Sequence, residues 1–306
     1  IWWAPMIPHR PHNPPLQYLQ AVDTHAINLR DVPQDKQSVF LEQEQRLLGT
    51  MGWFDAEFKK LYQSLQDKKQ LDNTLFIFLA DNGFSNRGAS KSSPYELGLR
   101  TPLIFYWPNH FPAQRIDAGV DTINLFRTVL DIAKIEQPSN ADLLGHSLLP
   151  VIEQKRTPVA EKLFGADYPA FTLKTDPLPR PERDIFALHV RDGDWKYIFF
   201  LRDVREQDNL DLTIQKGVMP FPERKAGDEE LFYLPNDPYE RNNLAAIANN
   251  HTRIQQYRRE VLQWWFNTGG KPLDAARPCT ETTSVLCHKL TEVPYQDLIR
   301  TTKQSH

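Results

Sequence analysis

Residues 74–108 read TLFIFLADNGFSNRGASKSSPYELGLRTPLIFYWP and contain two apolar runs separated by a polar loop. The first run covers residues 74–80, and the second covers residues 101–107 and ends before Pro108. Uninterrupted runs of this kind are typical of strands covered on both faces in a parallel sheet. Asp81-Asn82-Gly83 follows directly after the first run, at the strand end where open α/β sheets bind ligands. The stretch therefore predicts two central strands and a site at their edge.

The segments around this stretch alternate between strand and helix. Residues 1–6 (IWWAPM) predict a short buried strand. Apolar residues at helical spacing predict helices over residues 34–69 and 121–135. This order of elements predicts a layered α/β domain over residues 1–160.

The C-terminal part predicts a smaller α+β domain. The segment 161–184 is proline-rich and polar towards its end, and we interpret it as a linker. Apolar segments on both sides of Asp192-Gly193 predict a β-hairpin. A further strand at 230–234 and a helix at 249–266 follow. Residues 185–306 are therefore expected to form an antiparallel sheet plus a helix.

The composition is that of an ordinary globular protein. The chain has 306 residues, with 36 basic and 39 acidic side chains and a formal net charge of −3. A nucleic-acid or membrane-surface binder would show a basic face or run, so this near balance argues against both classes. No apolar run approaches the roughly 20 residues that a membrane-spanning helix requires.

Two features suggest an exported protein. Cys279 and Cys287 are the only cysteines, and either a disulfide between them or two free thiols is compatible with the sequence. Asn250-His251-Thr252 is a potential glycosylation sequon. We therefore expect a periplasmic, lysosomal or extracellular location, although residues 1–11 do not have the pattern of a signal peptide.

The loop after the first apolar run contains groups that suit an anionic ester. The carboxylate of Asp81 and the amide oxygen of Asn82 are ligands that Ca²⁺ or Mg²⁺ prefers. Lys91 lies in a loop of glycine, alanine and serine, and its ammonium is a compact partner for an anionic oxygen. Arg100, four residues after Glu96, is expected to form a structural ion pair or to brace the strand.

His9 and His12 lie in the proline-rich segment PHRPHNPP at 8–15. Two histidines without a nearby cysteine are too few for a zinc site. Histidine titrates near neutral pH, so a general acid or a substrate contact is the functional interpretation. The alternative is a histidine that only braces its loop through a hydrogen bond.

Taken in order, these segments resemble the sulfatases of the alkaline-phosphatase superfamily, specifically the second half of their sequence. The resemblance extends over residues 1–266. It is carried by PHRPHNPP at 8–15, DNTLFIFLADNG at 72–83, KSSPYELGLRTPLIFYWP at 91–108, GHSLLP at 145–150, DWKYI at 194–198 and ELFYLPNDPYE at 230–240.

The resemblance implies a role for each site residue. Asp81 and Asn82 are similar to two of the family's divalent-cation ligands, usually for Ca²⁺. Lys91 is similar to the lysine that contacts the sulfate oxygens. His9 is similar to the histidine that binds sulfate and protonates the leaving alcohol, and His12 is expected to face the substrate. The implied partner is a sulfated small molecule or a sulfated glycan.

Sulfatases also use a formylglycine made from Cys or Ser in a Cys/Ser-x-Pro/Ala-x-Arg motif, together with an Asp-Asp metal pair. Neither pattern occurs in this sequence. Both belong to the family's first half, so we expect an N-terminally truncated sulfatase that is inactive by itself. The missing half would supply the formylglycine.

Two other functions are compatible with the same residues. A phosphodiesterase or phosphonate hydrolase of the superfamily would have the same fold, but many of these relatives carry His where this chain has Asn82, and imidazole suits zinc or manganese better than calcium. A non-catalytic homologue acting as a binding or scaffold protein is the third possibility. The near-complete loop at 81–100 argues against such decay.

Overall fold

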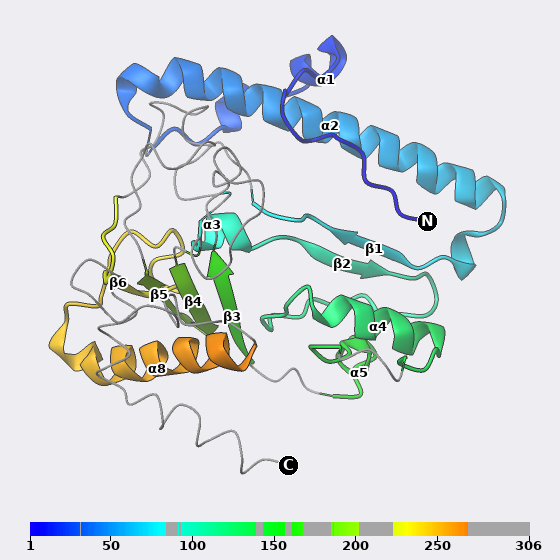
Figure 1. Ribbon diagram of the computed structural model, residues 1–306. Coiled ribbons are helices and arrows are strands. Elements are labelled where there is room, and N and C mark those ends of the chain that lie inside the picture. The colour runs from blue at the N-terminus through cyan, green and yellow to red at the C-terminus, as the bar shows by residue number, and fades with distance from the viewer. Residues whose placement is uncertain are drawn as a thin grey trace, which may run out of the picture.

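The computed structural model describes residues 1–30, 32–83, 91, 93–138, 143–156, 161–167, 185, 187–201 and 223–268. It has a two-stranded sheet in the N-terminal part and a four-stranded sheet in the C-terminal part, each covered by a long helix (Figure 1). None of the helices in these ranges is long and apolar enough to cross a membrane. Cys279 and Cys287 lie outside the described residues.

The N-terminal part is built around one long helix. Helix α1 (Leu16–Gln20) precedes α2 (Gln37–Asp67), which runs along strands β1 (Phe76–Leu79) and β2 (Leu103–Tyr106) (Figure 1). Short 3₁₀ turns flank these elements at Thr24–Ala26, Gln34–Lys36 and Leu71–Asn73. The predicted helix at 34–69 is confirmed, with its first residues in the 3₁₀ turn.

Aromatic side chains hold α2 against β1. Phe54 and Phe58 of the helix contact Phe78 and Phe76 of the strand, with ring centroids 6.0 and 5.7 Å apart. Trp3 stacks on Phe54, with ring centroids 5.3 Å apart. The N-terminal segment is thereby placed beside the helix that covers β1.

The two apolar runs, expected as strands of a parallel sheet, form an antiparallel pair instead. β1 and β2 pair antiparallel, with Phe76 opposite Tyr106 and Leu79 opposite Leu103. Among the described residues between them, the only helix is the single turn α3 (Glu96–Leu99), which is too short for the crossover that parallel neighbours require. β2 is also not covered on both faces, because Ile104 and Tyr106 are exposed.

The expected strand at 1–6 is also wrong. Residues 1–5 have no regular secondary structure, and Ile1, Trp2 and Met6 are exposed. Within the described parts of the chain, β1 and β2 have only each other as strand partners. The segment pairs with neither strand and is held by the ring of Trp3 instead.

Helices α4 (Asn124–Ala133) and α5 (Leu149–Ile152) lie together beyond β2 (Figure 1). The side-chain amide of Asn124 donates to the backbone oxygen of His146 at 3.0 Å. Gly145 has a φ of 77°, and a side chain there would meet the Ile123 carbonyl oxygen at 2.9 Å. The GHSLLP segment is thus a close-packed turn against α4, and the helix predicted at 121–135 is confirmed.

The C-terminal part is a four-stranded antiparallel sheet in the order β3-β4-β5-β6. Its strands are β3 (Lys162–Asp167), β4 (Ala187–Asp192), β5 (Trp195–Phe200) and β6 (Glu229–Tyr233), and α8 (His251–Asn267) follows after a 3₁₀ turn at Ala248–Asn250. The predicted hairpin is confirmed, with Gly193 in the left-handed conformation at φ 56°. The predicted strand at 230–234 and helix at 249–266 are confirmed as well.

Helix α8 covers one face of this sheet (Figure 1). The core between them contains side chains from alternate strand positions and from the inner face of the helix, among them Val190, Tyr197, Leu231, Tyr257 and Leu262. β3 lies inside the range 161–184 that we interpreted as a linker, so residues 162–167 are part of the sheet. The domain boundaries otherwise stay a prediction.

Candidate functional site

Asp81-Asn82-Gly83 lies directly after β1, as predicted, and its backbone is fixed against α3. The Gly83 N–H donates to the Gly98 carbonyl at 2.8 Å. A Cβ atom at Gly83 would lie 1.7 Å from the Leu97 carbonyl oxygen, so only glycine fits this approach. The two candidate cation ligands are therefore held by the residue that follows them.

The side chains of this pair are the right kind of donor for a hard cation. Asp81 is exposed and Asn82 is half-buried. One carboxylate oxygen of Asp81 accepts from the Asn82 N–H at 3.0 Å, which leaves the other oxygen available to a ligand. Among the described residues, no group of three or more His, Cys, Asp or Glu side chains could hold a metal ion. The pair fits Ca²⁺ or Mg²⁺ in chemistry and supplies only part of the six or more oxygens that Ca²⁺ requires.

Lys91 is half-buried and is followed by a buried stretch that leads into α3. Ser93 and Tyr95 in this stretch are each 2% exposed. Residues 84–90, which connect the cation pair to Lys91, lie outside the described part of the chain. The contacts that the structure describes do not join Lys91 to Asp81 or Asn82.

His9 is exposed, and its imidazole is oriented by its own loop. Nδ1 lies 2.7 Å from the Arg10 carbonyl oxygen, which can only accept, so Nδ1 carries a proton. Nε2 is then the nitrogen that remains for a ligand. The described contacts do not connect His9 with Asp81 or Lys91, so the assembly of the four residues in one site stays a prediction.

His12 is half-buried in the same loop. Burial lowers its pKa, and the nearby charges of Arg10 and His9 lower it further, while a hydrogen bond with the backbone of Pro8 acts in the opposite direction. The imidazole is therefore mainly neutral at neutral pH. A neutral ring suits the predicted substrate contact better than a charge interaction with an anion.

Sequence reasoning missed the partners of Glu96. Instead of pairing with Arg100, the Glu96 carboxylate lies 3.5 Å from Lys196 Nζ and 3.5 Å from Arg191 Nη1. Helix α3 ends at Leu99, so the spacing of four residues does not place Arg100 over Glu96. The available signal was Lys196 itself, a charged residue inside the apolar run of β5.

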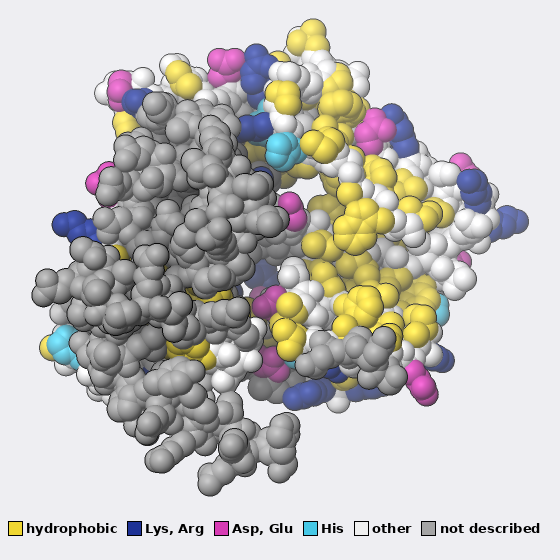
Figure 2. All heavy atoms as spheres, in the orientation of Figure 1, with side chains coloured by type: hydrophobic (Ala, Val, Ile, Leu, Met, Phe, Trp, Pro, Cys, Tyr) yellow, Lys and Arg dark blue, Asp and Glu magenta, His cyan; other side chains and the backbone are white. Residues whose placement is uncertain are grey.

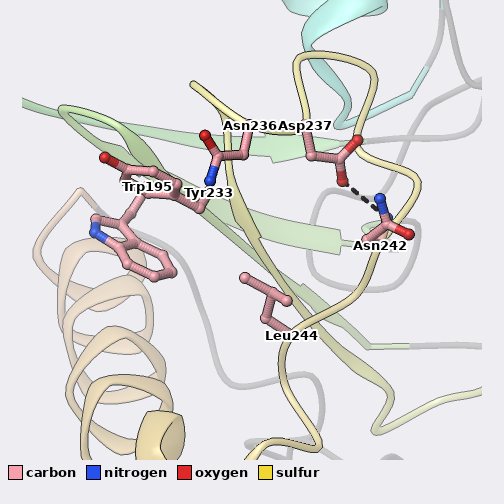
Figure 3. Close-up of a pocket in the computed structure, with 6 residues that line it drawn as sticks. All are labelled: Trp195, Tyr233, Asn236, Asp237, Asn242 and Leu244. Carbon is pink, nitrogen blue, oxygen red and sulfur yellow. Dashed lines mark hydrogen bonds between the residues drawn. The ribbon is translucent and has the colours of Figure 1, made fainter.

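The cavity in Figure 3 is separate from these residues. It has a volume of about 290 Å³ and is lined by Trp195, Tyr233, Asn236, Asp237, Asn242 and Leu244. Trp195 packs against the core under α8, whereas Lys196, the next residue of β5, contacts Glu96 on the opposite face of the sheet. Both oxygens of Asp237 accept from backbone N–H groups of Arg241 and Asn242, so this carboxylate holds a turn.

Comparison with known proteins identifies the family. The sequence profile described as Sulfatase matches residues 1–135, and the profile described as N-sulphoglucosamine sulphohydrolase, C-terminal, matches residues 89–219. The chain belongs to the sulfatase family. It is 29% identical over 209 residues to an ulvan-active sulfatase of Formosa agariphila, and the match covers 65% of this chain and 39% of that one. It is also 29% identical over 275 residues to the human N-acetylgalactosamine-6-sulfatase, covering 82% of this chain and 49% of the human one.

Solved sulfatase structures have the same fold. The putative sulfatase yidJ from Bacteroides fragilis superposes with a TM-score of 0.66 at 16% identity, over 89% of this chain and 54% of that one. A structure in complex with its substrate D-glucosamine-2-N,6-O-disulfate gives 0.59 at 22% identity, over 77% and 43%. The predicted fold class, an α/β partial alkaline-phosphatase-like architecture with a smaller antiparallel sheet plus helix, is confirmed. The chain spans about half of the length of these relatives.

Proposed function

We propose that this chain carries half of the active site of a sulfuric ester hydrolase. The observation that carries the proposal is that Asp81, Asn82, Lys91, His9 and His12 all lie in the segment 1–135 that matches the sulfatase profile. The fixed strand end at Asp81-Asn82-Gly83 supports it, because it presents two hard oxygen donors at the sheet edge.

In this proposal each residue acts on a different part of a sulfate monoester. Asp81 and Asn82 would hold a divalent cation, Ca²⁺ or Mg²⁺, which supplies positive charge next to the sulfate. Lys91 would neutralise a non-bridging oxygen. His9 would donate a proton from Nε2 to the bridging oxygen as a nucleophile bonds to sulfur and the S–O bond breaks, so that the product leaves as a neutral alcohol. Positive groups placed around the developing charge lower the barrier by stabilising the transition state.

We also propose that another stretch of polypeptide completes the site. The formylglycine nucleophile and the remaining cation ligands would come from it. An exposed apolar surface supports this part, because Figure 2 shows hydrophobic side chains gathered over β1, β2 and α4. Ile104 on β2 is 54% exposed, and Phe126 on α4 is 56% exposed. Apolar surfaces of this kind mark interfaces in soluble proteins.

The substrate is proposed to be a sulfated glycan or a sulfated small molecule. One structural neighbour was solved with a glucosamine disulfate and another with the oligosaccharide k-i-k-neocarrahexaose. We propose export to the periplasm, a lysosome or the extracellular space. The side-chain amide of the sequon residue Asn250 donates to the Leu244 carbonyl at 3.0 Å, and glycosylation of that nitrogen would leave it one N–H.

A phosphodiesterase or phosphonate hydrolase is the alternative. A phosphonate monoester hydrolase from Silicibacter pomeroyi superposes with a TM-score of 0.56 at 17% identity, which shows the shared fold only. Asn82 favours the sulfatase, because an amide oxygen prefers a harder cation than zinc. A non-catalytic scaffold, the third candidate, would bind no cation tightly.

The test compares two esters in one protein. A polypeptide that extends this chain to the length of its relatives is assayed with an aryl sulfate and with an aryl phosphonate, with and without a calcium chelator. The proposal predicts faster turnover of the sulfate and its loss with the chelator. Preference for the phosphonate would support the alternative, and turnover of neither ester would support the scaffold.

A further inference from the structure

The loop that leads from Lys91 into α3 is fastened to the C-terminal sheet. Tyr95 is 2% exposed and packs against Phe232 of β6, with ring centroids 6.2 Å apart. Its hydroxyl donates to Glu230 Oε2 at 2.6 Å. The other oxygen of Glu230 is held by Arg224. This set lies on the face of the sheet opposite α8.

Glu96 provides a second attachment through both its backbone and its side chain. Its N–H donates to Glu240 Oε2 at 2.5 Å. Its carboxylate lies 3.5 Å from Lys196 Nζ, and Lys196 is only 1% exposed. Arg191 on β4 approaches the second carboxylate oxygen, also at 3.5 Å. Residues about 100 and 144 positions away in the sequence thus converge on one turn of helix.

The same turn holds the candidate cation ligands. The Gly98 carbonyl accepts from the Gly83 N–H, and the Gly98 N–H donates to the Tyr95 carbonyl, both at 2.8 Å. The Leu97 carbonyl leaves no space for a side chain at Gly83. A shift of α3 would therefore move the backbone that carries Asp81 and Asn82.

Stability alone is a poor explanation for charges at this place. A buried ion pair costs desolvation, and apolar residues of similar volume often stabilise a protein equally well. Hydrogen-bonded charges instead fix one orientation, since each donor has a defined acceptor. The neighbouring Ile198 and Phe200 show that this sheet face accommodates apolar side chains.

We propose that Lys196, Glu230 and Glu240 are positioning residues for the Asp81–Asn82 pair, acting through Tyr95 and Glu96 of α3. The inference rests on the proposed function of that pair as cation ligands. Lys196 in the C-terminal sheet then contributes to cation binding without touching the cation. The C-terminal sheet of this chain then helps to set the geometry of the site.

The test uses Lys196→Met, with Lys162→Met as the matched control. Lys162 also forms ion pairs in this sheet, with Asp192 and Glu260, but on the side of α8. Two quantities are measured: hydrogen exchange of the Gly83 amide in the 306-residue chain, and Ca²⁺ affinity by calorimetry in the completed protein. Lys196→Met is expected to speed exchange and to weaken Ca²⁺ binding by about tenfold or more, as loss of outer partners does at other metal sites. Lys162→Met is expected to change neither, and Lys196→Arg should restore most of the affinity.

If Lys196→Met does not fold, Tyr95→Phe takes its place, since it removes only the hydroxyl that reaches Glu230. Gly83 exchange and Ca²⁺ affinity that match the Lys162→Met control would overturn the positioning proposal. Absence of Ca²⁺ binding in the wild-type completed protein would instead contradict the proposed function. The two failures are therefore distinguishable.

Discussion

Asp81 and Asn82 differ in how firmly the structure holds them. Asp81 is exposed and accepts one hydrogen bond from the next residue, so its carboxylate can turn towards a ligand. Asn82 is half-buried, and Gly83 after it is locked against α3. The negative charge of the pair is therefore on the accessible side chain of Asp81. The position of the pair is set by the backbone at Gly83, which α3 holds.

Replacing Asp81 by Asn should weaken cation binding without affecting folding. The substitution removes the negative charge of the pair and keeps its shape. We expect a decrease in Ca²⁺ affinity of at least about tenfold, the loss that even indirect partners produce. Calorimetric titration of the completed protein measures it, with the exposed Asp67→Asn as the control. Equal affinities in the two variants would exclude Asp81 as a ligand.

Replacing Gly83 by Ala should destabilise the chain. The added methyl group would meet the Leu97 carbonyl oxygen at 1.7 Å, so α3 must move. Overpacking of this kind costs about 1–3 kcal/mol. Gly52→Ala is the control, because its methyl group would meet only Tyr18 at 3.9 Å and alanine favours a helix interior by about 1 kcal/mol. Urea unfolding should therefore move in opposite directions for the two variants, and a neutral Gly83→Ala would contradict the close approach.

Helix α3 is the element that connects the two sheets. It is a single turn, and its stability comes from the C-terminal sheet, not from its own length. Glu240 is central to this contact, and burial raises its pKa to about 7. The charges of Glu96 and Glu230 add to this effect, while Lys196 and the N–H of Glu96 oppose it.

The free energy of unfolding should depend on pH through the protonation of the Glu240 carboxyl. The ordinary pKa is 4.5, so between about pH 4.5 and 7 the folded state binds more protons at Glu240 than the unfolded state does. The stabilisation that protonated Glu240 gives the folded state is therefore lost as pH rises through this range, by roughly 3 kcal/mol at most. Glu240→Gln should remove that part of the decline in thermal stability between pH 5 and 8.

Two other groups, Glu230 and His189, also affect how the stability of the wild-type protein changes with pH. The pKa of Glu230 is also raised by burial, and burial lowers the pKa of His189, which disfavours the folded state below about pH 6.5. The difference between wild type and Glu240→Gln isolates the one group. Glu136→Gln, at an exposed site, is the control. Parallel profiles for wild type and Glu240→Gln would show that Glu240 is not buried as described.

Local turn chemistry explains which elements were predictable. Asp192-Gly193 specifies a hairpin by itself, and α2 and α8 have helical spacing along their whole length. The direction of β2 was not predictable, because an apolar run reads the same in parallel and antiparallel pairs. Asp81-Asn82 was predictable as a strand end, but its attachment through Glu96 to Lys196 depends on residues 100 positions apart, which no local pattern records.

The distribution of apolar surface distinguishes the two parts of the molecule. The C-terminal sheet has a core on both faces, one under α8 and one under Tyr95. The face over β1, β2 and α4 has no such cover among the described residues, and Ile104, Tyr106, Ile123 and Phe126 are exposed there. The half of the molecule that carries the candidate cation ligands is thus the half with the uncovered apolar face.

The exposed apolar face over β1, β2 and α4 should bind an apolar dye in the isolated chain. The stretch of polypeptide that is proposed to complete the site should block this binding. The isolated 306-residue chain is expected to increase the fluorescence of anilinonaphthalene sulfonate, and the completed protein is expected to do so much less. Ile104→Thr with Phe126→Ser should reduce the signal of the isolated chain. Equal dye binding by the isolated chain and the completed protein would show that the face is not the interface.

The most direct measurement is the rate of sulfate release from an aryl sulfate by the 306-residue chain alone and by the completed protein. We predict no release above background for the chain alone. The completed protein should turn over the ester, and Lys91→Met should lower its rate by about 10²–10³-fold, the usual cost of removing one group that stabilises developing charge. The exposed Lys68→Met should keep the full rate. Turnover by the chain alone, or a completed protein indifferent to Lys91, would contradict the assignment of half a sulfate-ester site to these residues.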